Sequence, residues 1–176
     1  MGNIYIGDSK QEIPVLFDTG SPMVYVLTDK CDSALCPQNK KFQAFASGTY
    51  KENSDGIKDD LAHCYGQGCV NGYVSRDNIC FTKDGNANSC VNGATFLAVK
   101  EATDIDKDKF SGIVGLGPMS DIARMPAFLE QASAMGSVGN SNDVSPIFSF
   151  YLSNSETKTG KLTFGGYNLA SYAKPG

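Results

Sequence analysis

Histidine is nearly absent from this sequence, because His63 is the only one among 176 residues. A Ser-His-Asp triad therefore has no obvious candidate. The six cysteines also contain no Cys-x-x-Cys pair of the kind that holds zinc. A site built from His63 and nearby thiols is the weaker alternative, and we expect no metal.

Basic clusters and long apolar runs are also missing. The fifteen Lys and Arg residues are scattered and the formal net charge is −4, which argues against a nucleic-acid partner. No apolar run approaches the ~20 residues that span a bilayer, so we expect no membrane span. A P-loop is absent and the glycine-rich stretch 112–117 lacks the dinucleotide-binding spacing, so we expect no cofactor.

Turn-forming residues are abundant, with nineteen glycines and seven prolines, and 41% of the residues are hydrophobic. This composition predicts a mostly β chain with its own core, organised as a single domain over 1–176. We expect strands at 4–6, 13–17, 24–27, 70–81, 94–99, 147–152 and 160–166. One helix is expected at 126–136, where Pro126 suits the first turn and Gly136 the C-terminal cap.

The six cysteines allow fifteen pairings, and their spacing favours three local ones. The expected disulfides are Cys31–Cys36, Cys64–Cys69 and Cys80–Cys90. Three disulfides in so short a chain indicate an oxidising compartment, so we expect a leader that lies outside this sequence.

One short stretch, 15–26, combines strand and turn signals around a single acid. Three apolar residues run into Asp18, and the small residues Thr19, Gly20 and Ser21 follow before the sequence turns apolar again. The simpler interpretation is a turn that Asp18 caps. The alternative is a carboxylate held at the floor of a cleft.

The stretch 17–21, Phe-Asp-Thr-Gly-Ser, resembles the active-site motif of pepsin-like aspartic peptidases, and further segments follow in that family's order. The segment 31–36 is similar to its short disulfide loop, 65–77 to its flap, and 110–117 to the segment behind the catalytic loop. The remaining similar segments are 42–50, 126–131, 145–154 and 160–168. Together they indicate one lobe of the pepsin-like acid protease fold, a closed, barrel-like β structure with one or two short helices.

The resemblance implies a role for each matching residue. Asp18 is the expected catalytic acid, in a loop with Thr19, Gly20 and Ser21. In this family two aspartates share one proton, because two like charges so close together cannot both ionise. The remaining expected site residues are Tyr65, Gly66 and Gln67 on the flap, and Leu16, Phe110 and Ile113 beside the scissile bond.

Only one Asp-Thr-Gly occurs, so the chain supplies half of such a site. We expect a second lobe or a second chain to supply the other aspartate, and a peptide or protein as substrate. Three explanations stay open: a piece of a bilobal enzyme, a homodimer, or a non-catalytic binding or inhibitor protein. The family and the cysteines predict a secreted or an endolysosomal or vacuolar protein.

Some residues depart from the family pattern. Ser111 stands where Asp is usual, Tyr25 replaces a tryptophan, and Gln67 replaces a threonine at the flap tip. If Cys64 and Cys69 are bridged, we expect the flap to be stiffer than usual.

Overall fold

The computed structural model describes residues 1–31, 36, 40–52, 60–65, 68–86, 89–103, 110–118, 125–134, 147–154, 159–168 and 170. The side chain of residue 65 is outside this description. The strands of the described chain are β1 Gly2–Ile6, β2 Gln11–Asp18, β3 Val24–Leu27, β4 Lys51–Glu52, β5 Leu61–Tyr65, β6 Gly68–Cys80, β7 Cys90–Thr103, β8 Gly112–Gly115, β9 Phe148–Tyr151 and β10 Lys161–Phe164. A 3-10 turn covers Ala44–Ala46, and helix α1 covers Phe128–Ala134.

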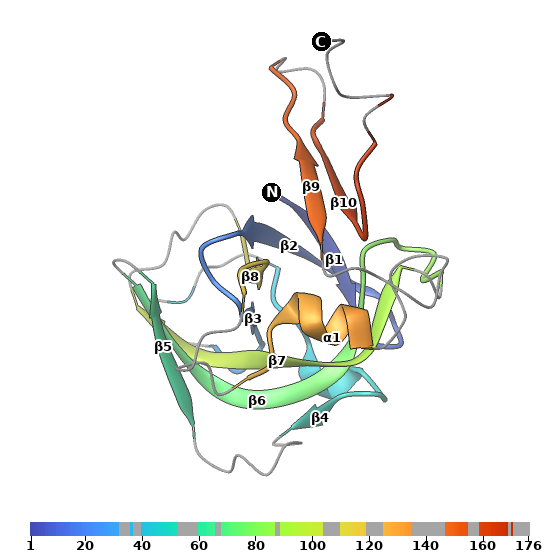
Figure 1. The fold of residues 1–176 in the computed structure, drawn as a ribbon. Coiled ribbons are helices and arrows are strands. Elements are labelled where there is room, and N and C mark those ends of the chain that lie inside the picture. Colours follow the sequence, from blue (N-terminus) through green and yellow to red (C-terminus); the bar gives the residue numbers. More distant parts are fainter. Residues whose placement is uncertain are drawn as a thin grey trace.

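Most strands belong to one mixed sheet that closes on itself. Its order is β1-β2-β8-β3-β7-β6-β4, and β1 also pairs with β6, while β5 pairs with β6. The long strands β6 and β7 curve beneath β3, β8 and α1 in this view, and α1 lies against β7 (Figure 1). The predicted mostly β, barrel-like fold with a short helix is therefore confirmed.

The strands follow the alternation of apolar residues. In β2, Ile13 and Val15 are fully buried, whereas their neighbours are half-buried. All four residues of β3 are buried, because this strand lies between β7 and β8 inside the sheet. Their side chains contribute to two apolar clusters that form the core.

Several elements differ in extent from the prediction. Strand β7 continues well beyond 94–99, and β4 and the 3-10 turn lie in a stretch where no strand or helix was expected. Helix α1 begins at Phe128 rather than Pro126. The predicted C-cap, Gly136, lies outside the described residues.

Strands β9 and β10 form a separate antiparallel hairpin that projects from the sheet (Figure 1). The first residues of β1 lie near its base. Phe164 of β10 packs on Phe81, with ring centroids 4.5 Å apart, so the hairpin is attached to the core through aromatic side chains.

The expected disulfides are present as Cys31–Cys36, Cys64–Cys69 and Cys80–Cys90. The last two each join directly opposed residues of neighbouring antiparallel strands. Within the described part of the chain, no helix is long and apolar enough to cross a membrane.

Candidate active site

Asp18 is the last residue of β2, and β8 holds it in place. The two strands run parallel, with Asp18 opposite Gly115. The backbone carbonyl of Asp18 accepts a hydrogen bond of 2.7 Å from the Leu116 N–H. The backbone of the acid is therefore part of the sheet, although its side chain is only half-buried.

Each oxygen of the Asp18 carboxylate accepts a hydrogen bond from the loop that follows it. The Gly20 N–H donates to Oδ1 over 3.0 Å, and the Ser21 hydroxyl donates to Oδ2 over 2.7 Å. Ser21 is buried, so its hydroxyl is held in position. These two bonds orient the carboxylate while its outer side stays accessible to solvent.

The loop after Asp18 lies directly against β8 and the residues that follow it. The Gly115 N–H donates to the Met23 carbonyl over 3.0 Å, and the Gly117 N–H donates to the Ser21 carbonyl over 2.9 Å. A Cβ atom on Gly115 would lie 2.5 Å from the Ser21 oxygen. Glycine is therefore required there, because the two backbones are too close for a side chain.

Leu16, Ile113 and Phe110 are brought together on one side of this arrangement. Leu16 is directly opposite Ile113 in the β2–β8 pair. Leu16 and Phe110 are partly buried and pack against the core cluster that contains Ile113 and Tyr25. Their expected place beside a bound peptide stays a prediction.

The expected flap corresponds to the hairpin of β5 and β6. Tyr65 is the last residue of β5 and its backbone is opposite Gly68. The side chain of Tyr65, together with Gly66 and Gln67, lies outside the described residues, so their contact with a substrate stays a prediction.

Ser111, which replaces the family's usual aspartate, is completely buried just before β8. Its backbone N–H donates to the Pro14 carbonyl and its carbonyl accepts from the Leu27 N–H. Among the described residues, its hydroxyl has no hydrogen-bond partner.

The described part of the chain contains no group of three His, Cys, Asp or Glu side chains placed to hold a metal ion.

A cavity beside the loop that follows Asp18 was not predicted from the sequence. It has a volume of about 670 Å³ and lies between the start of the chain, the end of β2 and the β9–β10 hairpin. Thr19, the residue directly after Asp18, contributes to its wall together with Met1 and Phe17. The alternating pattern at 147–152 predicted a strand but gave no sign that part of that strand would be uncovered.

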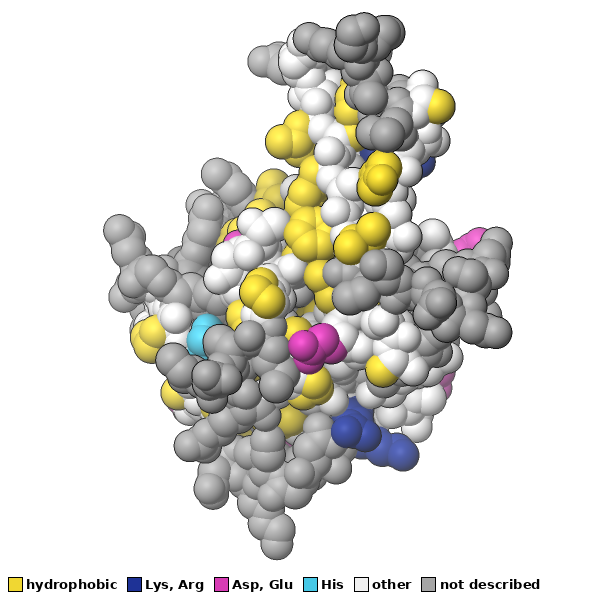
Figure 2. Space-filling model, viewed as in Figure 1, with side chains coloured by type: hydrophobic (Ala, Val, Ile, Leu, Met, Phe, Trp, Pro, Cys, Tyr) yellow, Lys and Arg dark blue, Asp and Glu magenta, His cyan; other side chains and the backbone are white. Residues whose placement is uncertain are grey.

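Apolar side chains remain exposed along this hairpin, as the yellow atoms of Figure 2 show. Leu152 is 80% exposed, Phe150 43% and Tyr167 66%. Large apolar side chains that gather on one projecting element are candidates for an interaction site, whereas single ones scattered over a surface are ordinary.

Comparison with known proteins agrees with the fold. A model of the eukaryotic aspartyl protease family matches residues 1–175. The chain is 31% identical over 179 residues to plasmepsin IV of Plasmodium falciparum, covering 99% of this chain and 36% of the relative. It is 30% identical over 174 residues to gastricsin of Callithrix jacchus, covering 97% and 42%.

A third relative, vacuolar protease A of Neurospora crassa, is 28% identical over 173 residues, covering 96% of this chain and 40% of the relative. The chain thus spans well under half the length of these three relatives. With the family model matching nearly every residue and the closed β sheet holding the Asp-Thr-Gly-Ser loop, the chain belongs to the eukaryotic aspartyl protease family.

Proposed function

We propose that the chain supplies one half of the catalytic site of an aspartic endopeptidase, with Asp18 as one of its two acids. The observation that carries this proposal is the carboxylate itself. It is half-buried, accepts hydrogen bonds from Gly20 and Ser21, and lies on a loop backed by the glycines of β8. The Gly20 bond alone would fit an acid that caps a turn. The added Ser21 hydroxyl bond and the close approach of β8 to the loop are what favour a positioned carboxylate.

In the proposed reaction, two carboxylates act on one water molecule and one peptide bond. The ionised carboxylate removes a proton from the water, while the protonated one donates a hydrogen bond to the scissile carbonyl oxygen. The water oxygen then bonds to the carbonyl carbon, and the carbonyl oxygen takes the proton of the second carboxyl group. The C–N bond of this tetrahedral intermediate breaks as the amine nitrogen takes the proton that the first carboxylate had removed from water. One intermediate hydroxyl returns its proton to the second carboxylate, so a carboxylic acid and an amine leave and the shared proton is restored. Gly20 and Ser21 hold Asp18 in the orientation that this step needs.

The second acid comes from outside these residues, in a second lobe or a second chain. The cavity beside Thr19 and the exposed apolar side chains of Phe150 and Leu152 form the surface on which that partner docks. Burial of this surface stabilises the assembly by the hydrophobic effect. It also places the partner next to Asp18.

The substrate is a peptide in extended form, covered by the β5–β6 hairpin. Tyr65, Gly66 and Gln67 close over it and exclude water, and Leu16, Phe110 and Ile113 contact its side chains. The three disulfides and the relative named vacuolar protease A support a secreted or an endolysosomal or vacuolar location.

Substitution of Asp18 in the native protein, purified with any partner that it has in the cell, tests the proposal. Asp18→Asn keeps the shape of the side chain but removes the acid, so cleavage of an unfolded protein at acid pH should fall at least about 1,000-fold. Asp84→Asn is the matched control, because Asp84 is an exposed acid in the loop between β6 and β7. Its activity should match the wild type.

Full activity of Asp18→Asn would overturn the proposal. A wild-type protein that binds the inhibitor pepstatin without cleaving any substrate would instead indicate a non-catalytic binding protein of the same fold.

A further inference from the structure

The three disulfides differ sharply in exposure. The four cysteines of Cys31–Cys36 and Cys80–Cys90 are between 0% and 3% exposed. In the third disulfide, Cys64 is exposed and Cys69 half-buried. A thiolate must reach a sulfur atom to exchange with a disulfide, so exposure is the first requirement for reaction.

The position of Cys64–Cys69 in the sheet makes it easier to open. It joins opposed residues at the end of the β5–β6 hairpin, next to the terminal pair Tyr65 and Gly68. Among the described elements, β5 pairs only with β6. On the β6 side Cys69 also pairs with Thr103 of β7, so that strand is held on both edges. Residues 61–64 of β5 are only half-buried or exposed, and such an edge segment opens locally at low cost in free energy.

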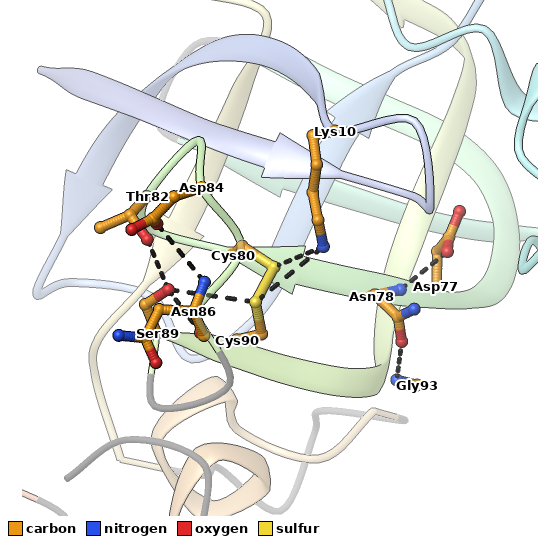
Figure 3. Close-up of a disulfide and its surroundings, with 10 residues drawn as sticks. All are labelled: Lys10, Asp77, Asn78, Cys80, Thr82, Asp84, Asn86, Ser89, Cys90 and Gly93. Atoms are coloured by element: carbon orange, nitrogen blue, oxygen red, sulfur yellow. Dashed lines mark hydrogen bonds between the residues drawn. A yellow bond between two sulfur atoms is a disulfide. The ribbon is translucent and has the colours of Figure 1, made fainter.

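Cys80–Cys90 provides an internal comparison. The Lys10 ammonium points toward the Cys80 sulfur (Figure 3). The two atoms are 3.0 Å apart. A cation beside a sulfur stabilises the thiolate that leaves during exchange, so charge alone would make this disulfide the more reactive one.

Burial opposes that effect of charge at Cys80–Cys90. The loop beside it is held by a hydrogen bond of 2.8 Å from the Phe81 N–H to the Ser89 carbonyl, and by another of 2.8 Å from the Ser89 hydroxyl to the Asn86 carbonyl. Both sulfur atoms therefore stay covered in the folded protein. Access, rather than charge, decides which disulfide reacts.

We propose that Cys64–Cys69 is a thiol-exchange site that reacts in the folded protein with low-molecular-weight thiols and dithiols. The thiolate of the reagent attacks the sulfur of Cys64, the more exposed of the two residues, and forms a mixed disulfide, and Cys69 leaves as a thiolate that takes up a proton. A second reagent thiolate then attacks the reagent sulfur and displaces Cys64. The chain gains two electrons and two protons, and the reagent becomes a disulfide.

The consequence for activity rests on the proposed function. With the disulfide intact, the two strands that carry the Tyr65 end of the hairpin are joined covalently. Reduction removes that link but leaves the backbone pairing of β5 with the body of β6. The reduced hairpin therefore closes less firmly over a peptide, which raises KM more than it lowers kcat.

Timed alkylation under native conditions tests the proposal. The oxidised protein is incubated with dithiothreitol, free thiols are trapped with iodoacetamide, and each cysteine is quantified by peptide mass spectrometry. Cys64 and Cys69 should be labelled at least about tenfold faster than the other four, which stay protected until the protein unfolds. Earlier labelling of Cys80 and Cys90, or equal rates for all three pairs, would overturn it.

A variant with Cys64→Ser and Cys69→Ser is the matched control and should show no early labelling. Hydrogen exchange of β5 amides should be faster in the reduced wild type, and unchanged exchange would also count against the proposal. Neither measurement needs proteolytic activity. Failure of the proposed peptidase function is therefore distinguishable from failure of the exchange site.

Discussion

Gly115→Ala is the substitution that most directly disturbs the support beneath Asp18. A Cβ atom on Gly115 would lie 2.5 Å from the Ser21 carbonyl oxygen, and 2.6 Å from both the nitrogen and the oxygen of Met23. Ordinary van der Waals contacts of a Cβ atom begin near 3.4 Å. All three neighbours are backbone atoms of the Asp18 loop, so none can rotate away as a flexible side chain would.

The magnitude follows from these overlaps. Overpacking of a tightly packed site costs about 1–3 kcal/mol, and three backbone overlaps place this site at the upper end, about 3 kcal/mol. With a urea m-value of about 2 kcal/mol/M, the unfolding midpoint should fall by about 1.5 M. Asp18 moves with the loop, so activity should fall in the variant even under conditions where it stays folded.

Gly166→Ala is the matched control, since a Cβ atom there meets nothing within 4 Å. Its free energy of unfolding should stay within about 0.5 kcal/mol of the wild type. Both variants are measured by urea unfolding followed by circular dichroism, with the disulfides kept oxidised. A Gly115→Ala midpoint within 0.5 M of the control, about a third of the expected shift, would refute the close contact between β8 and the Asp18 loop.

Two further substitutions probe the helix and the hairpin. Gln131→Glu removes the two hydrogen bonds that the Gln131 amide donates to the Thr95 and Pro126 carbonyls, each 3.1 Å long. The free energy of unfolding, measured in urea at pH 7, should therefore fall by about 2–3 kcal/mol. A fall below 0.5 kcal/mol, within the range of ordinary surface changes, would contradict this. Burial lowers the pKa of His63, so the unfolded chain takes up the proton first as the pH falls below about 6.5. The free energy of unfolding of the wild type should therefore fall relative to that of His63→Gln as the pH is lowered from 7.5 to 5. A difference between the two proteins that stays constant over this range would show that the burial of His63 has no such effect.

Local patterns predicted the local features of the fold. The alternation at 13–17 places Ile13 and Val15 in the core, and the short spacings between cysteines match the three disulfides that form. The Phe-Asp-Thr-Gly-Ser motif identified the family because it occurs among several segments in the right order. Each of these signals spans only a few consecutive residues. Each can therefore be recognised in a single sequence without knowledge of the three-dimensional structure.

Long-range contacts were not predictable in the same way. The family resemblance already placed 110–117 behind the catalytic loop, but no local pattern gives the register that sets Asp18 opposite Gly115. Nor does any local pattern show that β1 closes the sheet against β6. Gln131 looks like a solvent-facing polar residue of a short helix, yet it is buried and bonds to both the N–H and the carbonyl of Thr95. Such contacts depend on where distant strands meet, which a local pattern does not encode.

The central claim is that Asp18 hydrolyses peptides only together with a second acid from outside these 176 residues. The most direct test is the initial rate of peptide cleavage by the isolated chain, measured against its concentration, with Asp18→Asn as a blank for contaminating proteases. The account predicts either no activity at any concentration or a rate that rises with the square of the concentration. A rate directly proportional to concentration and lost in Asp18→Asn, from a chain that analytical ultracentrifugation shows to be monomeric at those concentrations, would mean that one chain holds a complete site and would contradict the account.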